Sequence, residues 1–176
     1  MLENLVIRAA KQNDVPSLLS LNRKWQRSAV GSDTSRGFLS GEIPADAFSA
    51  MIANNDIAVA DDGTGNIVGY QLISNTSGGS IINIHGDLIE AITNKGLIPS
   101  GSRIGLGVQI CIDSDYQGTG LRTKILQLLR QLANERYEYL FSTVGKENER
   151  SARAHKADGW EIIWDTATHY CILYRL

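Results

Sequence analysis

The sequence predicts one α+β domain that spans residues 1–176. Its 176 residues, 43% of them hydrophobic, are enough for one well-packed core and too few for two comfortable ones. Residues 104–112 carry an aliphatic side chain at every even position, which is the pattern of a strand with one buried face. Residues 121–132 repeat apolar side chains every three or four positions, as an amphipathic helix does.

The segments before this strand predict a strand, two helices and a hairpin. Residues 5–9 are typical of a short strand, and a helix follows with an apolar stripe made of Val15, Leu18, Leu21 and Trp25. Residues 28–41, rich in Ser, Gly, Asp and Thr, indicate a loop before a second helix that begins at Pro44. Residues 57–60 and 67–74 predict two strands joined by a turn.

The rest of the chain predicts an insertion and the C-terminal elements. Residues 75–103 are longer than a simple connection and contain a short helix over 87–94, so they could form a lid or an interface. After the central helix come a strand over 137–144, a helix that contains His155, and two final strands. We expect these strands at residues 161–164 and 170–174.

Composition narrows the classes of function. The net charge of −2 argues against a general nucleic-acid binder. Cys111 and Cys171 form neither a disulfide framework nor a metal-binding spacing, which indicates reduced cysteines of a cytoplasmic protein. The three histidines are scattered, so no metal site is expected. No apolar stretch is long enough for a membrane span or a secretion signal.

A candidate anion site lies between the strand and the central helix, in the turn Gln117-Gly118-Thr119-Gly120-Leu121-Arg122. The first N–H groups of a helix lack intrahelical partners and carry partial positive charge. Gly118 and Gly120 remove side chains that would keep a phosphate away from those groups. Nearby cations are Arg122, Lys124 and Arg130. A glycine turn of this kind is also a common tight connection, and the residues alone leave both interpretations open.

Two known phosphate-binding loops fit this turn badly. No Walker A string occurs in the chain. A dinucleotide fingerprint needs a third glycine where Thr123 stands, and an acid at the end of the next strand, whereas Glu138 precedes that strand.

A third loop matches better. The turn resembles the acetyl-coenzyme A pyrophosphate loop, Q/R-x-x-G-x-G/A, of the GNAT N-acetyltransferase superfamily. Gln117 and Gly120 match this pattern, and Gly118 is a frequent occupant of its position. Arg122 departs from it, because that place usually holds Gly or Ala. Its long side chain must turn away from the pyrophosphate or lie alongside it as a cation.

A second motif supports the resemblance. Asn148, Ser151 and His155 are spaced to share one face of a helix, which Gly159 is well placed to end. In the family a strand is followed by N-x-x-(A/S)-x-x-x-Y-x-x-x-G-F/W, and this chain keeps four of those positions, the last being Trp160. His155 stands where the family has a Tyr near the coenzyme sulfur. Two motifs in the family's order are more specific than either alone.

The resemblance implies a fold and an activity. The fold is a three-layer α/β/α arrangement around a mixed, mostly antiparallel sheet of about six to seven strands, the GNAT acyl-CoA N-acyltransferase fold. The activity is direct transfer of acetyl from acetyl-coenzyme A to a primary amine of a small molecule or peptide. By position, the backbone of Ile110, Cys111 and Ile112 would bind the pantetheine arm, and residues 26–43 would face the acceptor unless they form an ordinary surface loop.

The role of His155 has two interpretations. In the first it replaces the Tyr as general acid to the departing thiolate. In the second it is an exposed or partly buried helix residue that hydrogen-bonds the coenzyme without transferring a proton, or has no role. Asn148 and Ser151 are candidate coenzyme contacts, although Asn148 also suits a helix cap. The implied partners are acetyl-coenzyme A and an amine acceptor, with a homodimer through residues 76–103 as an option.

Two other classes of function stay open. One is a non-catalytic acyl-coenzyme A binding or sensor module on the same fold, which the replacement of the Tyr keeps under consideration. The other is a structural subunit in which the glycine turn is only a connection. The sequence identifies neither the acceptor nor a general base, since Asp113 and Asp115 suit the shaping of a turn equally well.

Overall fold

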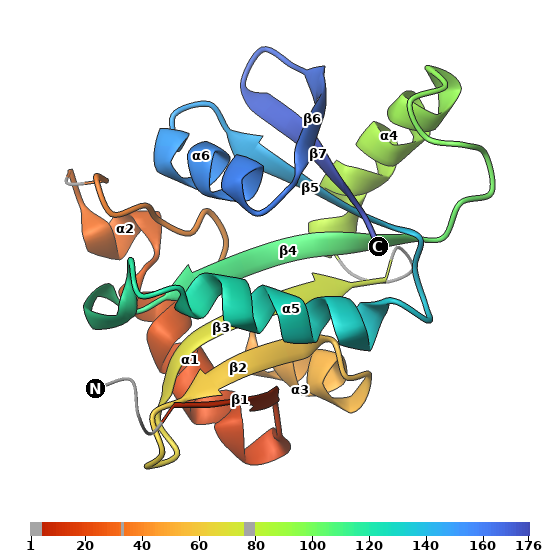
Figure 1. The fold of residues 1–176 in the computed structure, drawn as a ribbon. Helices are drawn as coiled ribbons and strands as arrows, with labels where there is room; N and C mark the ends of the chain where they lie inside the picture. The colour runs from red at the N-terminus through yellow and green to blue at the C-terminus, as the bar shows by residue number, and fades with distance from the viewer. Residues whose placement is uncertain (1–4, 33, 76–79) are drawn as a thin grey trace. The chain divides into compact units, whose positions relative to one another are not determined.

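The computed structural model describes residues 5–32, 34–75 and 80–176, with the backbone alone for residues 80–85 (Figure 1). The described strands are β1 (Val6–Ala9), β2 (Ile57–Asp61), β3 (Ile67–Ser74), β4 (Ile104–Ile112), β5 (Tyr139–Gly145), β6 (Glu161–Asp165) and β7 (His169–Arg175). The α-helices are α1 (Val15–Lys24), α2 (Arg27–Val30), α3 (Ala45–Ala53), α4 (Ser80–Asn94), α5 (Leu121–Ala133) and α6 (Glu149–Ala157). Short 3-10 turns, η1 (Gln12–Asp14) and η2 (Ser114–Tyr116), precede α1 and α5.

The strands form one open mixed sheet in the order β1-β2-β3-β4-β5-β7-β6. The pairs β1–β2, β2–β3, β5–β7 and β6–β7 are antiparallel, whereas β4 and β5 are parallel. Two antiparallel neighbours can be joined by a short turn, but a parallel pair needs a crossover, and α5 supplies it between β4 and β5. The predicted mixed, mostly antiparallel sheet is confirmed.

Two compact units divide the chain between them. Unit 1 consists of Met1–Ile73 and Val108–Leu132, and unit 2 consists of Ser74–Gly107 and Ala133–Leu176. Strand β4 contributes its last five residues to unit 1 and its first four to unit 2. The assignment of residues 1–176 to a single domain stays a prediction.

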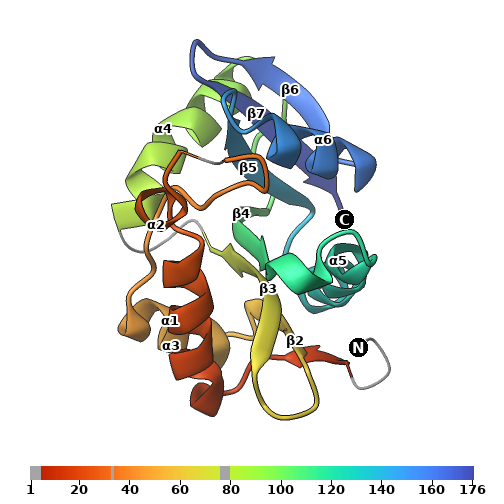
Figure 2. The ribbon, with the colours of Figure 1, turned by 90° about the vertical axis from the view of Figure 1, so that its left-hand side faces the viewer.

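Unit 1 buries both faces of β3. Tyr70 packs edge-on against Phe48 of α3, with ring centroids 6.0 Å apart, and accepts a hydrogen bond from Asn22 of α1 at 2.9 Å. Its neighbour Gly69 faces the other way, where a Cβ atom would come within 3.0 Å of Ile125 of α5. Figure 2 shows α1 and α3 on one side of these strands and α5 on the other. Burial on both sides explains the nearly continuous apolar sequence of β3.

The one-sided burial predicted for residues 104–112 is wrong in both halves of β4. In the second half the even positions 108, 110 and 112 are half-buried and Cys111 is buried, and in the first half unit 2 covers both faces. Residues 104–107 are all buried, including the two odd-numbered glycines. A Cβ at Gly105 would lie 2.9 Å from the Tyr137 ring, and a Cβ at Gly107 would lie 3.0 Å from Trp160. The glycines therefore let aromatic rings pack directly on the second face of the strand. In unit 2, α4 and α6 lie on opposite sides of the strands (Figure 2).

Other predicted elements are confirmed with shifted ends. The short helix α2 interrupts the segment 28–41 that was expected to be a loop, and α4 begins at Ser80 rather than at residue 87. Residues 76–79 of the predicted insertion lie outside the described residues. In α5 the fully buried positions are Leu121, Ile125, Leu126, Leu129 and Ala133, while Leu128 and Leu132 are half-buried. No described helix has the length and apolar character that a membrane span requires.

A partly buried ion cluster ties the start of unit 1 together. The Arg8 guanidinium donates to both carboxylate oxygens of Asp14, at 2.7 and 2.9 Å, and to Asp61 at 2.8 Å. Burial alone would raise the pKa of Asp14, but the hydrogen bonds from Arg8 and the Lys11 N–H outweigh it and hold that pKa below its usual value. The hydrogen bond from Arg8 likewise lowers the pKa of Asp61. Both carboxylates are therefore ionised partners of Arg8, which joins β1, β2 and the start of α1.

We expect the change Arg8→Met to lower the free energy of unfolding by about 2 to 3 kcal/mol near pH 7, because it leaves two carboxylates poorly compensated. A depressed folded pKa stabilises the fold above the unfolded value of about 3.9, and this contribution is lost as the pH falls through the folded pKa. The difference between the two proteins should therefore shrink towards about pH 3. Urea unfolding followed by circular dichroism measures it.

The control for this prediction is Arg153→Met. Arg153 pairs with Glu149 on the surface, where the two side chains are 74% and 77% exposed. This change should alter stability by no more than about 0.5 kcal/mol. Equal effects of the two changes would show that Arg8 contributes no more than a surface ion pair.

Candidate functional site

The turn between β4 and α5 is shaped by its own polar side chains. Asp113 accepts a hydrogen bond from the Ser114 N–H at 2.7 Å and caps η2. The Gln117 side-chain amide donates to the carbonyl of Ile112 at 3.0 Å, and the Thr119 hydroxyl donates to the carbonyl of Tyr116 at 2.6 Å. Three side chains thus hold the path of the backbone from the end of β4 to the first turn of α5.

This path leaves the glycines open to their surroundings. Gly118 and Gly120 have φ values of +77° and +80°, which side-chain-bearing residues rarely adopt, and a Cβ at either position would meet nothing within 4 Å. Among the described residues, no acceptor pairs with the N–H groups of Gly118, Thr119 or Gly120. These donors stand at the positive end of a helix of 13 residues. The turn therefore has the geometry that an anion-binding loop needs.

The cations beside the turn differ in burial. Arg122 is half-buried with its Nη2 atom inside the protein, and Arg130 is half-buried with its Nε atom inside. Lys124 is exposed. Lys124 is therefore the one of these three whose charge is fully available to a ligand in solvent.

The second motif forms one hydrogen-bonded group on α6. Asn148 is the N-cap and its side-chain oxygen accepts from the Ser151 N–H at 3.2 Å. His155 Nδ1 lies 2.8 Å from the Ser151 carbonyl oxygen, which can only accept, so Nδ1 carries a hydrogen. His155 is 7% exposed, and its imidazole packs edge-on against the Trp160 ring with the ring centroids 5.5 Å apart. Any proton that His155 exchanges with a ligand would therefore pass through Nε2.

The structure tests the predictions that concern the geometry of α6 itself. The cap that Asn148 was expected to form is confirmed, as is the shared face of Asn148, Ser151 and His155. Gly159 ends the helix with a φ of +88°. His155 is buried, and its role stays a prediction. The contacts of these residues with a coenzyme stay predictions.

The three β4 residues predicted to bind the pantetheine arm differ in how deeply their side chains are buried. Ile110 and Ile112 are half-buried, whereas Cys111 is buried and free. Burial raises the pKa of the Cys111 thiol, and the charge of Asp113 raises it further. A thiol held in this way is a poor nucleophile, because the thiolate is the reactive form.

Sequence reasoning missed a polar cluster on the α1 side of β4. The Asn22 amide donates to Gln109 Oε1 at 2.8 Å, and the Tyr70 hydroxyl donates to the same oxygen at 3.1 Å. The Gln109 amide donates to the carbonyl of Gly41, which also accepts from Gln26 at 2.9 Å. These bonds fasten the end of the segment 26–43 to β4. The signal available was Gln109 itself, the single amide in an otherwise apolar strand.

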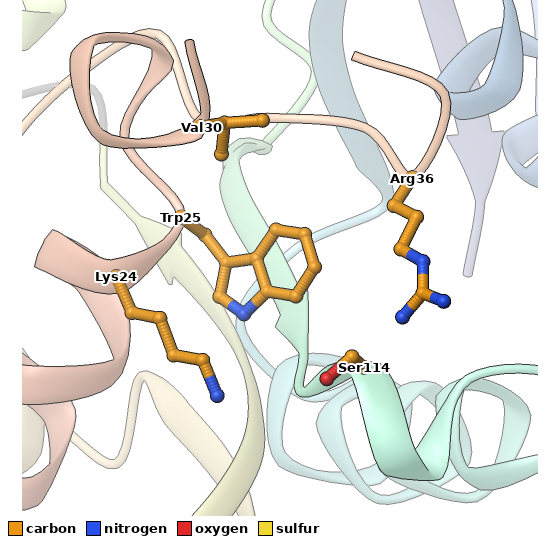
Figure 3. A pocket seen from close by; sticks show the side chains of 5 residues that line it. All are labelled: Lys24, Trp25, Val30, Arg36 and Ser114. Carbon is orange, nitrogen blue, oxygen red and sulfur yellow. The ribbon is translucent and has the colours of Figure 1, made fainter. Parts of the chain in front are cut away.

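A pocket of about 270 Å³ lies under the segment 26–43, which resemblance had assigned to the acceptor. Its walls are the side chains of Lys24, Trp25, Val30, Arg36 and Ser114 (Figure 3). The segment is closed at its base by two backbone hydrogen bonds, from Arg27 to Leu39 at 3.0 Å and from Leu39 to Trp25 at 2.8 Å. These bonds hold residues 25–27 against Leu39, and the role of the segment at the acceptor stays a prediction.

Asp113 is engaged at the edge of this pocket. Its carboxylate accepts a hydrogen bond from Lys24 at 2.7 Å as well as from Ser114. Partial burial would raise the pKa of Asp113, but the hydrogen bonds from Lys24 and from the Ser114 N–H outweigh it and keep the pKa below its usual value. A carboxylate stabilised in its ionised form is a weak proton acceptor, so Asp113 is poorly suited to be the general base.

Fold and turn together define the class of the structure, which is the GNAT acyl-CoA N-acyltransferase fold that the sequence predicted. A GNAT-family acetyltransferase from Listeria monocytogenes matches with a TM-score of 0.69 over 98% of this chain and 95% of its own, at 16% identity. A GNAT-family acetyltransferase from Streptococcus pneumoniae matches with a TM-score of 0.64 over 98% of this chain and 99% of its own, at 17% identity.

A third match carries a ligand. The PaiA N-acetyltransferase from Thermoplasma acidophilum, solved in complex with coenzyme A, has a TM-score of 0.64 and 10% identity, and the match covers 98% of this chain and 99% of that one. No protein-family model and no curated protein sequence matches the chain. At these identities the comparisons establish the fold.

We predict that Cys111 does not react in the native protein. Both cysteines are buried and burial raises the pKa of each thiol, so iodoacetamide near pH 8 should leave both unmodified, whereas both should react in urea. Mass spectrometry of the whole chain counts the labels. An acetyl group on Cys111 after exposure to acetyl-coenzyme A would contradict this prediction.

Proposed function

We propose that this protein is an acetyl-coenzyme A-dependent N-acetyltransferase that moves the acetyl group directly to a primary amine of a small molecule or peptide. The observation that carries the proposal is the glycine turn before α5, whose backbone donors at Gly118, Thr119 and Gly120 have no acceptor among the described residues. The GNAT fold around this turn, and the coenzyme A bound to the Thermoplasma acidophilum neighbour, support it.

The turn fits the diphosphate of a coenzyme in three respects. Its donors are backbone N–H groups, which suit phosphate oxygens. The space beside both glycines is open, whereas a side chain there would occupy the position of the ligand. The helix dipole and Lys124 add positive charge at the same end. Gln117 and Thr119 would act indirectly, since their side chains hold the turn.

Bound acetyl-coenzyme A would supply an activated acetyl thioester. The chain's part is to bind it through residues 117–122 and the backbone of residues 110–112, and to supply a proton as the thiolate departs. His155 is the candidate for the proton, which it would give from Nε2 as an imidazolium, because Nδ1 keeps the hydrogen that it donates to Ser151. Asn148 and Ser151 would set the position of this imidazole, because they are bonded to one another and Ser151 to the ring.

Direct transfer is favoured over an acetylated enzyme. Cys111 lies in the strand segment proposed to bind the pantetheine arm, but its thiol is buried and its pKa is raised. The acceptor amine would therefore attack the thioester itself. Two reduced cysteines are also consistent with a cytoplasmic location, which we include in the proposal.

We predict that calorimetric titration with acetyl-coenzyme A detects binding and that Gly120→Ala weakens it by about tenfold or more, because the new Cβ occupies the space beside the donors. The control is Gly65→Ala, in the turn between β2 and β3, where φ is +90° and a Cβ also meets nothing within 4 Å. Both changes strain the backbone by about 1 to 2 kcal/mol. Only the change at Gly120 should alter coenzyme affinity.

The outcomes separate the candidate functions. Binding with release of free thiol in the presence of amines indicates the transferase. Binding without thiol release over a broad panel of amines and peptides would instead indicate the sensor module. Absence of binding by the wild-type protein would refute both and leave the turn as a connection.

We predict that His155→Ala and His155→Phe both lower kcat by about a hundredfold if His155 is the general acid. Phe keeps an aromatic ring against Trp160 but has no nitrogen, so it distinguishes chemistry from packing. Steady-state thiol release as a function of pH provides the readout, and thermal unfolding shows whether each variant is folded. Wild-type turnover in the Phe variant would assign His155 a packing role.

A further inference from the structure

The pocket under the segment 26–43, called the Trp25 pocket below, is lined by Lys24, Trp25, Val30, Arg36 and Ser114. Lys24 and Trp25 lie at the end of α1, Val30 ends α2, and Arg36 lies in the loop after α2. Ser114 begins η2, the short turn that follows β4. All of them belong to unit 1. Its chemistry can therefore be derived from one compact part of the protein.

A buried donor in this pocket lacks a partner. Trp25 is 8% exposed, and its Nε1 atom has no hydrogen-bond acceptor among the described residues. Leaving an indole N–H buried and unpaired is costly, and such groups in native proteins usually have an acceptor. Figure 3 shows the nitrogen edge of the ring turned towards the ends of the Lys24 and Ser114 side chains. An oxygen atom of a ligand in the pocket would satisfy this donor.

The other lining groups favour the same kind of ligand. Arg36 has no ion-pair partner among the described residues, and its guanidinium faces the pocket from the side opposite Lys24 (Figure 3). Lys24 holds Asp113, but an ammonium has three hydrogens to donate. The Ser114 hydroxyl is already directed at the carboxylates of Asp115, at 3.2 Å, and Asp113, at 3.4 Å, so it is not counted as a donor to a ligand. The donors that remain are Arg36, Lys24 and the Trp25 N–H, and an Arg fork suits a carboxylate in particular.

The anion is more consistent with the acceptor than with the coenzyme. The glycine turn leads into α5, which covers the face of β3 that bears Gly69. The Trp25 pocket lies at the end of α1, the helix that covers the opposite face, which bears Tyr70. The two sites thus use helices on opposite faces of the unit 1 strands, and they share the connection from β4 to α5, which contributes Ser114 to the pocket. One ligand can occupy each.

We infer that the Trp25 pocket binds the carboxylate of the acyl acceptor, so that the acceptor is a small amino carboxylate. This inference rests on the proposed acetyltransferase function and specifies its substrate class. The volume of about 270 Å³ lies just below the range of pockets for drug-sized ligands, about 300 to 1,000 Å³, and suits a molecule the size of an amino acid. Val30 supplies one apolar contact.

The first test compares acceptors that differ only in charge. The wild-type protein is assayed for thiol release with L-amino acids and with their α-carboxamides, which keep the amine and side chain but lose the carboxylate. The preferred amino acid should have a kcat/KM at least about tenfold above that of its carboxamide. Equal values, or activity confined to amines without a carboxylate, would overturn the inference.

The second test changes the pocket. Arg36→Gln should raise the KM for the amino acid by about tenfold and abolish the preference over the carboxamide, with coenzyme affinity unchanged by calorimetry. Trp25→Phe keeps an aromatic six-membered ring but removes the pyrrole part of the indole together with its N–H, and should raise the same KM about threefold or more. Arg23→Gln is the control, since Arg23 is exposed and paired with Glu42 outside the pocket. A loss of coenzyme affinity in Arg36→Gln would assign the anion to the coenzyme and overturn the inference.

A binding measurement separates this inference from the proposed function. Titration of the preferred amino acid into the wild-type protein should change the tryptophan fluorescence, and the change should be lost in Trp25→Phe and weakened in Arg36→Gln. If the wild-type protein binds acetyl-coenzyme A and acetylates amines but no amino carboxylate binds, the inference alone fails. If coenzyme binding is absent while the fluorescence response persists, the proposed function fails and the anion pocket stands.

Discussion

The structure depends on a difference in burial between the two halves of β4. The first half is buried on both faces in unit 2, which is possible because Gly105 and Gly107 leave room for Tyr137 and Trp160. The second half, in unit 1, carries polar or titratable side chains at Gln109 and Cys111 and leads to Asp113. The strand is core on both faces at one end, and at the other it is half-buried and carries one amide, Gln109. The proposed binding sites lie around that half-buried end, because the glycine turn and the Trp25 pocket both begin where β4 stops.

Most of the fold could be predicted because its signals are local. Period-2 and period-3.6 patterns identified β4 and α5 within the correct residues, and turn-forming residues identified the hairpin of β2 and β3. The failures were also physical. A four-residue helix such as α2 is too short to have a period, and the apolar run at residues 81–84 is compatible with either a strand or a helix. Burial of Gly105 depends on Tyr137, more than 30 residues away, which no local window contains.

The candidate site was predictable where it uses the main chain and unpredictable where it uses side chains. The glycine turn was visible because positive φ values and close approach require glycine at particular spacings. The polar cluster of Asn22, Tyr70 and Gln109 is assembled from α1, β3 and β4, so its members are adjacent only after folding. Trp25 was read as part of the apolar stripe of α1, and its ring is indeed buried. Its unpaired N–H becomes apparent only when its neighbours are known.

The motif residues also show how function and local structure share the same side chains. Gln117 closes the turn onto Ile112 and Asn148 caps α6, so each has a structural reason to be present whether or not it touches a coenzyme. Binding through backbone N–H groups requires only two glycines and the side chains that hold the turn. Binding of the proposed acceptor requires particular side chains, such as Arg36 and the indole N–H of Trp25. Because a backbone turn places few demands on side chains, it is compatible with a fold shared with neighbours at 10–17% identity.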